Sequence, residues 1–191
     1  MWSSECEGQV YGPDVNEWFS DVLQTPCRLV YMPDDSERTI NPLFNKGSEI
    51  VSFADGYPLM VLGEESLNDL NSRLETELPM NRFRPNLVID GSEAYAEDRW
   101  KRVRIGDTTF RSTKPCARCV MTTVDQSLGD FDGKEPLKTF AGYRKASQVI
   151  PDHFEVFGMG KNDVCFGQNL VPENVGNSLK IGDKVEILET Y

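Results

Sequence analysis

KPCARCVMTTVD, residues 114–125, holds the densest set of chemically reactive residues in the chain. It contains a C-x-x-C pair, Cys116 and Cys119, with Arg118 directly before the second cysteine. The residues that follow, VMTTVD at 120–125, are rich in β-branched side chains, which favours a strand. We therefore expect a strand, and not a helix, to follow the cysteine pair.

Four interpretations of this pair remain open from the residues alone. A thioredoxin-like redox pair is disfavoured, because it would open a helix. A zinc site needs two more ligands at suitable spacing, and the other candidate ligands are scattered. Those candidates are Cys6, Cys27, His153 and Cys165. The remaining interpretations are a single thiolate ligand for a soft metal centre, which Arg118 would favour, and simple packing of two small side chains.

The hydrophobic pattern around this stretch predicts many short strands and few helices. Apolar residues at helical spacing predict a helix over 14–23, with Asp14 able to cap it, and a second one through Leu67, Leu70 and Leu74. EPLKTFAGYR at 135–144 predicts a third helix. Strands are expected at 27–32, 48–53, 86–90, 100–105, 108–113, 120–125, 164–171 and 179–188. This order predicts a mainly β fold, a barrel decorated by a few short helices.

Net charge restricts the classes of partner. The chain carries 20 basic and 31 acidic residues, a net charge of −11. Such acidity disfavours general binding of nucleic acid or anionic membranes, which Lys and Arg drive. We expect no nucleic-acid partner and no membrane partner. An odd number of cysteines, five, predicts no disulfide framework, and we expect a cytoplasmic location.

The basic residues are concentrated in one segment. Residues 82–118 hold nine basic and five acidic side chains, a local balance of 9 − 5 = +4. This contrast indicates a site for a small anion held by arginine forks. Arg84, in the run FRPN, and Arg118 are the candidates. Arg99, Lys101 and Arg102 are better explained as a solvated strand face.

The opening stretch is one of six runs that come in a fixed order, and this ordered set is far more specific than any single motif. They are NRFRPNLVIDG (81–91), YAEDRWKRVRIGD (95–107), KPCARCVMTTVD (114–125), GKEPLKTFAGYR (133–144), VCFGQNLV (164–171) and LKIGDKVEIL (179–188). In this order they resemble the MOSC domain of amidoxime-reducing proteins and their bacterial relatives. EWFSDVLQTPCRLVYMP at 17–33 is similar to the end of that family's N-terminal β-rich region.

The resemblance implies a MOSC-type β-barrel core that binds the molybdenum cofactor, molybdopterin. We expect residues 1–47 to be a remnant of the N-terminal β-rich region and 48–191 to be the MOSC domain. The resemblance gives Cys119 as the metal ligand. Asp125 is a candidate proton relay, although an aspartate at a strand end is more often a turn residue. The expected cofactor-binding residues are Asp55, Gly56, Arg84, Asn86, Ala117, Arg118, Cys119 and Asn169.

Four departures from the family pattern are expected to matter. The first strand of the N-terminal β-rich region, with its basic pterin contacts, is not in this sequence. Ala117 stands where relatives often have serine, and Ser92 where some have cysteine. No four-cysteine iron–sulfur segment follows Tyr191.

The resemblance implies a molybdenum oxidoreductase that reduces N-hydroxylated small molecules. Its electron donor would be a small haem or iron–sulfur electron-transfer protein. Two alternatives stay open: a non-catalytic or cofactor-poor MOSC domain, and a sulfur carrier that holds a persulfide on Cys119.

Overall fold

The structure is a computed structural model that describes residues 4–47 and 49–191. It divides into two compact units, Met1–Pro58 and Leu59–Tyr191. No helix of the described residues is long and apolar enough to cross a bilayer.

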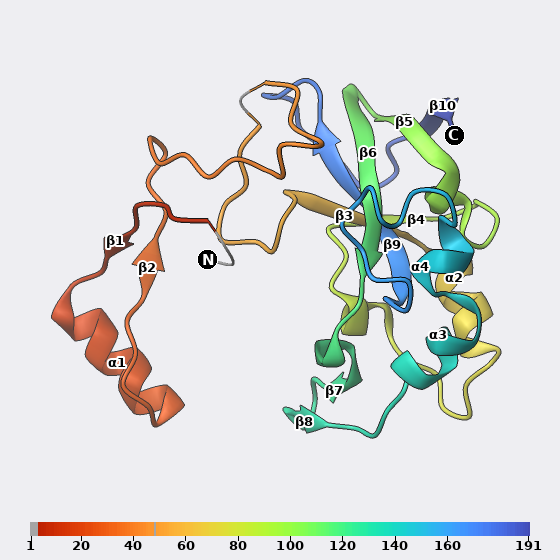
Figure 1. Cartoon of the computed structure of the whole chain (residues 1–191). Coiled ribbons are helices and arrows are strands. Elements are labelled where there is room, and N and C mark those ends of the chain that lie inside the picture. Colours follow the sequence, from red (N-terminus) through yellow and green to blue (C-terminus); the bar gives the residue numbers. More distant parts are fainter. Residues whose placement is uncertain (1–3, 48) are drawn as a thin grey trace. The chain divides into compact units, whose positions relative to one another are not determined.

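The first unit is built from one helix and two short strands (Figure 1). Strand β1 (Gln9–Val10) pairs antiparallel with β2 (Val30–Tyr31), and helix α1 (Pro13–Leu23) connects them. The helix begins after Gly12 with Pro13 in its first turn, so Asp14 does not cap it as expected. Proline suits this position because it has no N–H that needs an acceptor and its fixed φ matches the first helical turn.

Residues after 47 also belong to this first unit. The guanidinium of Arg38 donates to the carbonyl oxygens of Ser52, Ala54 and Asp55 at 2.6–2.7 Å. Of the strand expected over 48–53, residue 48 lies outside the described residues, and the rest is reduced to one isolated bridge between Thr39 and Ile50. Arg38 thus ties the loop at 52–55 to the first compact unit, which ends at Pro58. The family-domain boundary expected at residues 47–48 stays a prediction.

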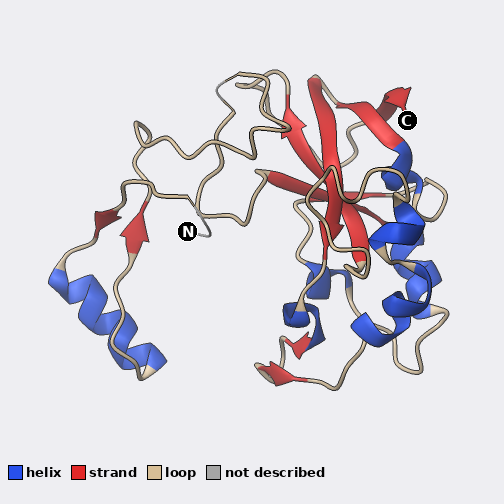
Figure 2. Cartoon of the chain, in the orientation of Figure 1, coloured by secondary structure: helices blue, strands red, loops and turns tan. Residues whose placement is uncertain are grey.

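The second unit is a curled six-stranded half-barrel in the strand order β10-β5-β6-β9-β3-β4 (Figures 1 and 2). All neighbouring pairs are antiparallel except β3 with β4. The strands are β3 (Leu59–Gly63), β4 (Leu87–Ile89), β5 (Trp100–Ile105), β6 (Thr108–Ala117), β9 (Cys165–Pro172) and β10 (Val185–Thr190). The mainly β fold expected from the sequence, decorated by short helices, is confirmed.

Short helices and turns complete this unit. They are α2 (Glu64–Asn71), α3 (Leu137–Tyr143), α4 (Ala146–Val149) and the 3-10 turns η1 (Met80–Phe83), η2 (Ala96–Arg99) and η3 (Val120–Thr123). A small hairpin joins β7 (Val124–Asp125) to β8 (Asp130–Phe131). The prediction of a strand over 120–125 is therefore wrong for residues 120–123, which form the turn η3. The hydroxyls of Thr122 and Thr123 bond back to the carbonyls of Cys119 and Val120, which closes a 3-10 turn there.

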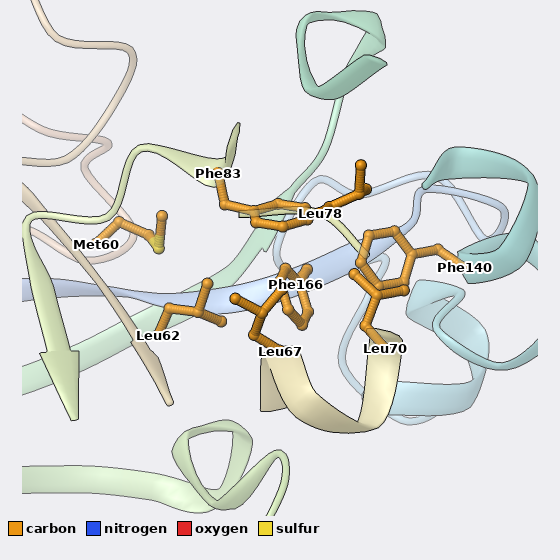
Figure 3. Packing of buried hydrophobic residues seen from close by; sticks show 8 residues of the cluster. All are labelled: Met60, Leu62, Leu67, Leu70, Leu78, Phe83, Phe140 and Phe166. Carbon is orange, nitrogen blue, oxygen red and sulfur yellow. The ribbon is translucent and has the colours of Figure 1, made fainter. Parts of the chain in front are cut away.

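Strand β3 is buried on both faces, and this explains its continuous apolar run. Met60 and Leu62 join a cluster with Phe83, Phe140 and Phe166, shown in Figure 3. The alternate residue, Val61, belongs to a second cluster on the opposite side of the strand. Consecutive strand residues point to opposite faces, so a central strand with two covered faces needs no polar alternation.

Gly167 allows β9 to lie close against β3. Its φ is +81°, and a Cβ placed there would lie 2.9 Å from the carbonyl oxygen of Val61 and 2.7 Å from the sulfur of Met60. Only glycine accepts both the left-handed backbone and this approach.

We predict that Gly167→Ala lowers the free energy of unfolding by at least about 2 kcal/mol, a fall in Tm of roughly 4–8 °C. Gly142→Ala is the matched control. Gly142 lies in helix α3 with no neighbour within 4 Å of an added Cβ, so alanine there should leave Tm unchanged or raise it slightly. Equal melting temperatures for the two variants would contradict the close approach.

Glu97 is a fully buried carboxyl beneath the start of α2. It accepts hydrogen bonds from the Gly63 nitrogen at 3.2 Å and from the Ser66 hydroxyl at 2.8 Å. Burial raises the pKa of Glu97 above its ordinary value. The folded chain therefore holds this proton more tightly than the unfolded chain, and the stability that it contributes is lost as pH rises through the folded pKa.

We predict that the parent chain loses stability relative to Glu97→Gln as pH rises from 5 toward 8. The glutamine keeps an oxygen for Gly63 and Ser66 but does not titrate. Thermal melting of both chains across this range measures the difference. Glu93→Gln, at an exposed carboxyl, should show no such trend. A Tm difference between parent and Glu97→Gln that is constant with pH would refute this role.

Candidate functional site

Strand β6 ends at the cysteine pair and presents its second cysteine to solvent. Ala117 is the last residue of the strand and pairs with Cys165 of β9. The Arg118 nitrogen then donates to the Val164 carbonyl at 2.8 Å. Cys119 follows in extended conformation as the first residue outside η3, and it is exposed. The chain thus fixes the backbone up to Arg118 and leaves the Cys119 thiol accessible.

The two cysteines occupy different environments. Cys116 is half-buried and packs against the aromatic cluster around Phe83. The Arg118 guanidinium donates from Nη1 to Cys116 Sγ at 3.5 Å and from Nη2 to the Phe83 carbonyl at 3.0 Å. Its Nε is buried and has no hydrogen-bond partner within the described residues. The positive charge of Arg118 therefore lies beside the first cysteine, and one of its donors remains available.

Arg84 and Asn86 lie in the loop between η1 and β4. Arg84 has a left-handed backbone with φ of +54°, and it is exposed. Asn86 continues the sheet instead, because its nitrogen donates to the Met60 carbonyl and its Oδ1 accepts from the Met60 nitrogen, both at 2.9 Å. Arg84 is thus free to bind an anion, whereas the contacts of Asn86 hold the backbone.

Asn169 flanks the same residue of β3 from the other side. It is the β9 partner of Met60, and its side-chain amide donates to the Lys114 carbonyl of β6 at 3.0 Å. A chain of contacts therefore links the FRPN loop to β6, the strand that precedes Cys119. It runs from Asn86 through Met60 and Asn169 to Lys114. Arg118 completes the connection through its bond to Phe83.

Asp125 ends β7 and builds the turn after it. Its Oδ1 accepts from the nitrogen and hydroxyl of Ser127 at 2.8 and 2.6 Å and from the nitrogen of Leu128 at 3.2 Å. The Ser127 hydroxyl, with the two backbone donors, lowers the pKa of the Asp125 carboxyl. A carboxylate held ionised in this way favours a turn-forming role. Proton relay by Asp125 stays a prediction.

Asp55 and Gly56 belong to the first unit. There the carbonyl of Asp55 accepts from the buried Arg38, and the Asp55 side chain is exposed. Sequence reasoning missed Arg38, because an isolated arginine in a polar loop gives no signal of burial.

Sequence reasoning also did not single out Arg82, which contacts the candidate residue Asp125. It is buried on η1, with Nη2 3.4 Å from the Asp125 carboxylate. The run FRPN directed attention to Arg84, two residues later. In contrast, Arg102 and Lys101 form exposed ion pairs with Glu173 and Glu189, which agrees with the solvated strand face expected for them.

A hollow of about 730 Å³ adjoins the Arg82–Asp125 pair. It is lined by residues 73–79, 81–82, 125–127, 132–135 and 138–139. Cys119, Arg84 and Arg118 are not among the described residues that line it. Chemical character places the candidate site at the exposed thiol, and not at this hollow.

Within the described ranges, no group of three or more His, Cys, Asp or Glu side chains is placed to hold a metal ion.

Comparisons with known proteins place these residues in a family. The family model for the MOSC domain matches residues 48–186. Mitochondrial amidoxime-reducing component 1 of Mus musculus is 40% identical over 189 residues, covering 96% of this chain and 53% of the relative. The Homo sapiens protein of the same name is 39% identical over 189 residues, covering 96% and 54%. Mitochondrial amidoxime reducing component 2 of Bos taurus is 37% identical over 190 residues, covering 97% and 54%. The chain spans about half the length of these curated relatives.

We predict that Asn86→Ala lowers the free energy of unfolding by about 1–2 kcal/mol, because it leaves the buried Met60 nitrogen without its acceptor. Asn86→Asp is the matched control, since its carboxylate oxygen can accept the same bond. Thermal or urea unfolding of both variants measures the difference. If alanine is as stable as aspartate, the Asn86 side chain does not support the sheet.

Proposed function

The chain belongs to the MOSC domain family, and we propose that it binds the molybdenum cofactor through Cys119 and reduces N-hydroxylated small molecules. The observation that carries this proposal is the exposed Cys119 thiol just after the end of β6, directly following Arg118, whose buried Nε has no hydrogen-bond partner among the described residues.

The residues fit a cofactor that brings both a metal and a phosphate. Soft metal centres favour thiolate ligands, and Cys119 has the exposure that such a ligand requires. A phosphate needs charge-assisted donors, and the exposed Arg84 and the half-buried Arg118 are the proposed cations. Ala117 has no hydroxyl to add, so its contribution is limited to the backbone beside Arg118.

The proposal gives each of the site residues a separate role. Cys119 holds the metal, and the sheet contacts of Arg118 and Asn169 fix the strand end that presents it. Arg84 and Arg118 bind and orient the anionic part of the cofactor. When bound, the molybdenum cofactor supplies the two-electron reduction. Asp55 and Gly56 stay proposed cofactor contacts from the first unit.

Exposed apolar side chains next to Cys119 support a small organic substrate. Val120 and Met121 directly follow the cysteine and are 54% and 57% exposed. They offer an apolar surface for the part of a substrate that does not react. The names of the relatives contain the term amidoxime-reducing, which supports an N-hydroxylated group as the reacting part. A small haem or iron–sulfur protein is the proposed electron donor.

The relatives are also named as mitochondrial, whereas the cytoplasmic location expected from the sequence stays a prediction.

We predict that Cys119→Ala abolishes molybdenum retention, whereas Cys116→Ala retains molybdenum and affects mainly stability. The reason is that Cys119 is exposed, while Cys116 packs in the aromatic cluster. Elemental analysis of protein from a cofactor-producing host measures the metal directly. Equal molybdenum in Cys119→Ala and the parent would refute the ligand assignment. Cyanide-releasable sulfur on Cys119 without molybdenum would support the sulfur carrier instead.

A further inference from the structure

Arg82 is a buried cation with too few partners. Its side chain is 5% exposed, and its Nε and Nη1 have no hydrogen-bond partner within the described part of the chain. Its one ion pair joins Nη2 to Asp125 Oδ2 at 3.4 Å. Burying a guanidinium costs folding free energy unless the charge is paired. Packing alone therefore does not account for a buried arginine at this position.

Asp125 connects Arg82 to the loop that follows Cys119. Its Oδ1 forms the turn with Ser127 and Leu128, which leaves Oδ2 toward Arg82. The turn stands only a few residues beyond Cys119, after η3 and β7. The contact between Arg82 and Asp125 therefore restrains the segment that carries the thiol.

Two other bonds join the same two segments. Gln126 Nε2 donates to the Asn81 carbonyl at 3.0 Å, and Arg118 Nη2 donates to the Phe83 carbonyl at 3.0 Å. Residues 81–83, the η1 segment, are thus joined at three points to residues 118–126, the cysteine segment. Cys119 lies between the Arg118 contact and the other two. Arg84 directly follows the η1 segment, so the same contacts fix its place relative to Cys119.

We propose that Arg82 is a positioning residue: through Asp125 it locks the cysteine segment to the η1 segment and so sets Cys119 relative to Arg84. Its importance for a bound cofactor rests on the proposed function. Locking the segments is a property of the chain itself and is measured without any cofactor. Arg82 contacts Asp125 and not the thiol, so it acts on Cys119 only through the loop.

Hydrogen–deuterium exchange of the parent and three variants tests this proposal. Arg82→Met removes the charge at similar length, and Arg82→Lys keeps the charge and should restore part of the effect. Asp125→Asn keeps the oxygen that forms the turn but removes the charge that Arg82 meets. Arg99→Met is the matched control, because Arg99 is 68% exposed and has a comparable ion pair at 3.5 Å.

We expect amide exchange in peptides covering 119–129 to become about tenfold faster in Arg82→Met and Asp125→Asn. Peptides covering β5 and the start of β6, residues 100–113, should keep the parent rate. Arg82→Lys should lie between the parent and Arg82→Met, and Arg99→Met should match the parent. Unchanged exchange over 119–129, or equal acceleration in both regions, would overturn the proposal, since the second result marks general destabilisation.

Molybdenum content of the same proteins from a cofactor-producing host separates the two proposals. Lower content in Arg82→Met than in the parent, together with faster exchange over 119–129, supports the positioning role. Parent-level content in a variant with a loosened cysteine segment would overturn that role. Molybdenum absent from the parent as well would refute the proposed function, while faster exchange over 119–129 would still support the lock between the segments.

Discussion

Antiparallel pairing of β6 with β9 is the interaction on which the second unit depends. These two strands are the middle pair of the sheet, so β5 and β10 attach through β6, and β3 and β4 attach through β9. The pairing runs from Phe110 opposite Pro172 to Ala117 opposite Cys165. Irregular register near Pro115 interrupts the ladder just before the cysteine pair, because proline has no N–H to donate. The sheet therefore delivers Arg118 to a fixed place and ends there.

Burial and exposure are divided sharply at this strand end. Cys165, opposite Ala117, is fully buried, and burial raises the pKa of its thiol to about 12. Cys116 packs beside the Phe83 cluster, and Cys119 alone of these three is exposed. Three thiols that lie close in the fold thus differ in their access to solvent. This difference, and not the C-x-x-C spacing, distinguishes a candidate ligand from two packing residues.

Polar groups inside the unit serve the backbone as much as the site. Asn86 and Asn169 bond to backbone atoms of Met60 and Lys114, and Glu97 holds the start of α2. A residue carried over from a family motif can therefore be needed because it holds the sheet without touching a ligand. Arg84 differs from these residues, because it is exposed and its side chain does not hold the sheet. Arg82 differs from them too, because its side chain joins two segments of the chain.

The sequence by itself determined the order of short strands, the helices near 14–23, 64–71 and 137–143, and the family, because periodicity and ordered motifs are local properties of the chain. It also directed attention to Arg84, Arg118 and Cys119. It did not determine the turn at 120–123, since threonine hydroxyls that bond back to the chain overrode a β-branched run. Only the tertiary structure decided that Arg82 is buried against Asp125 and that Asn86 supports Met60. Those contacts join residues far apart in sequence, and no spacing along the chain encodes which distant partner will lie opposite.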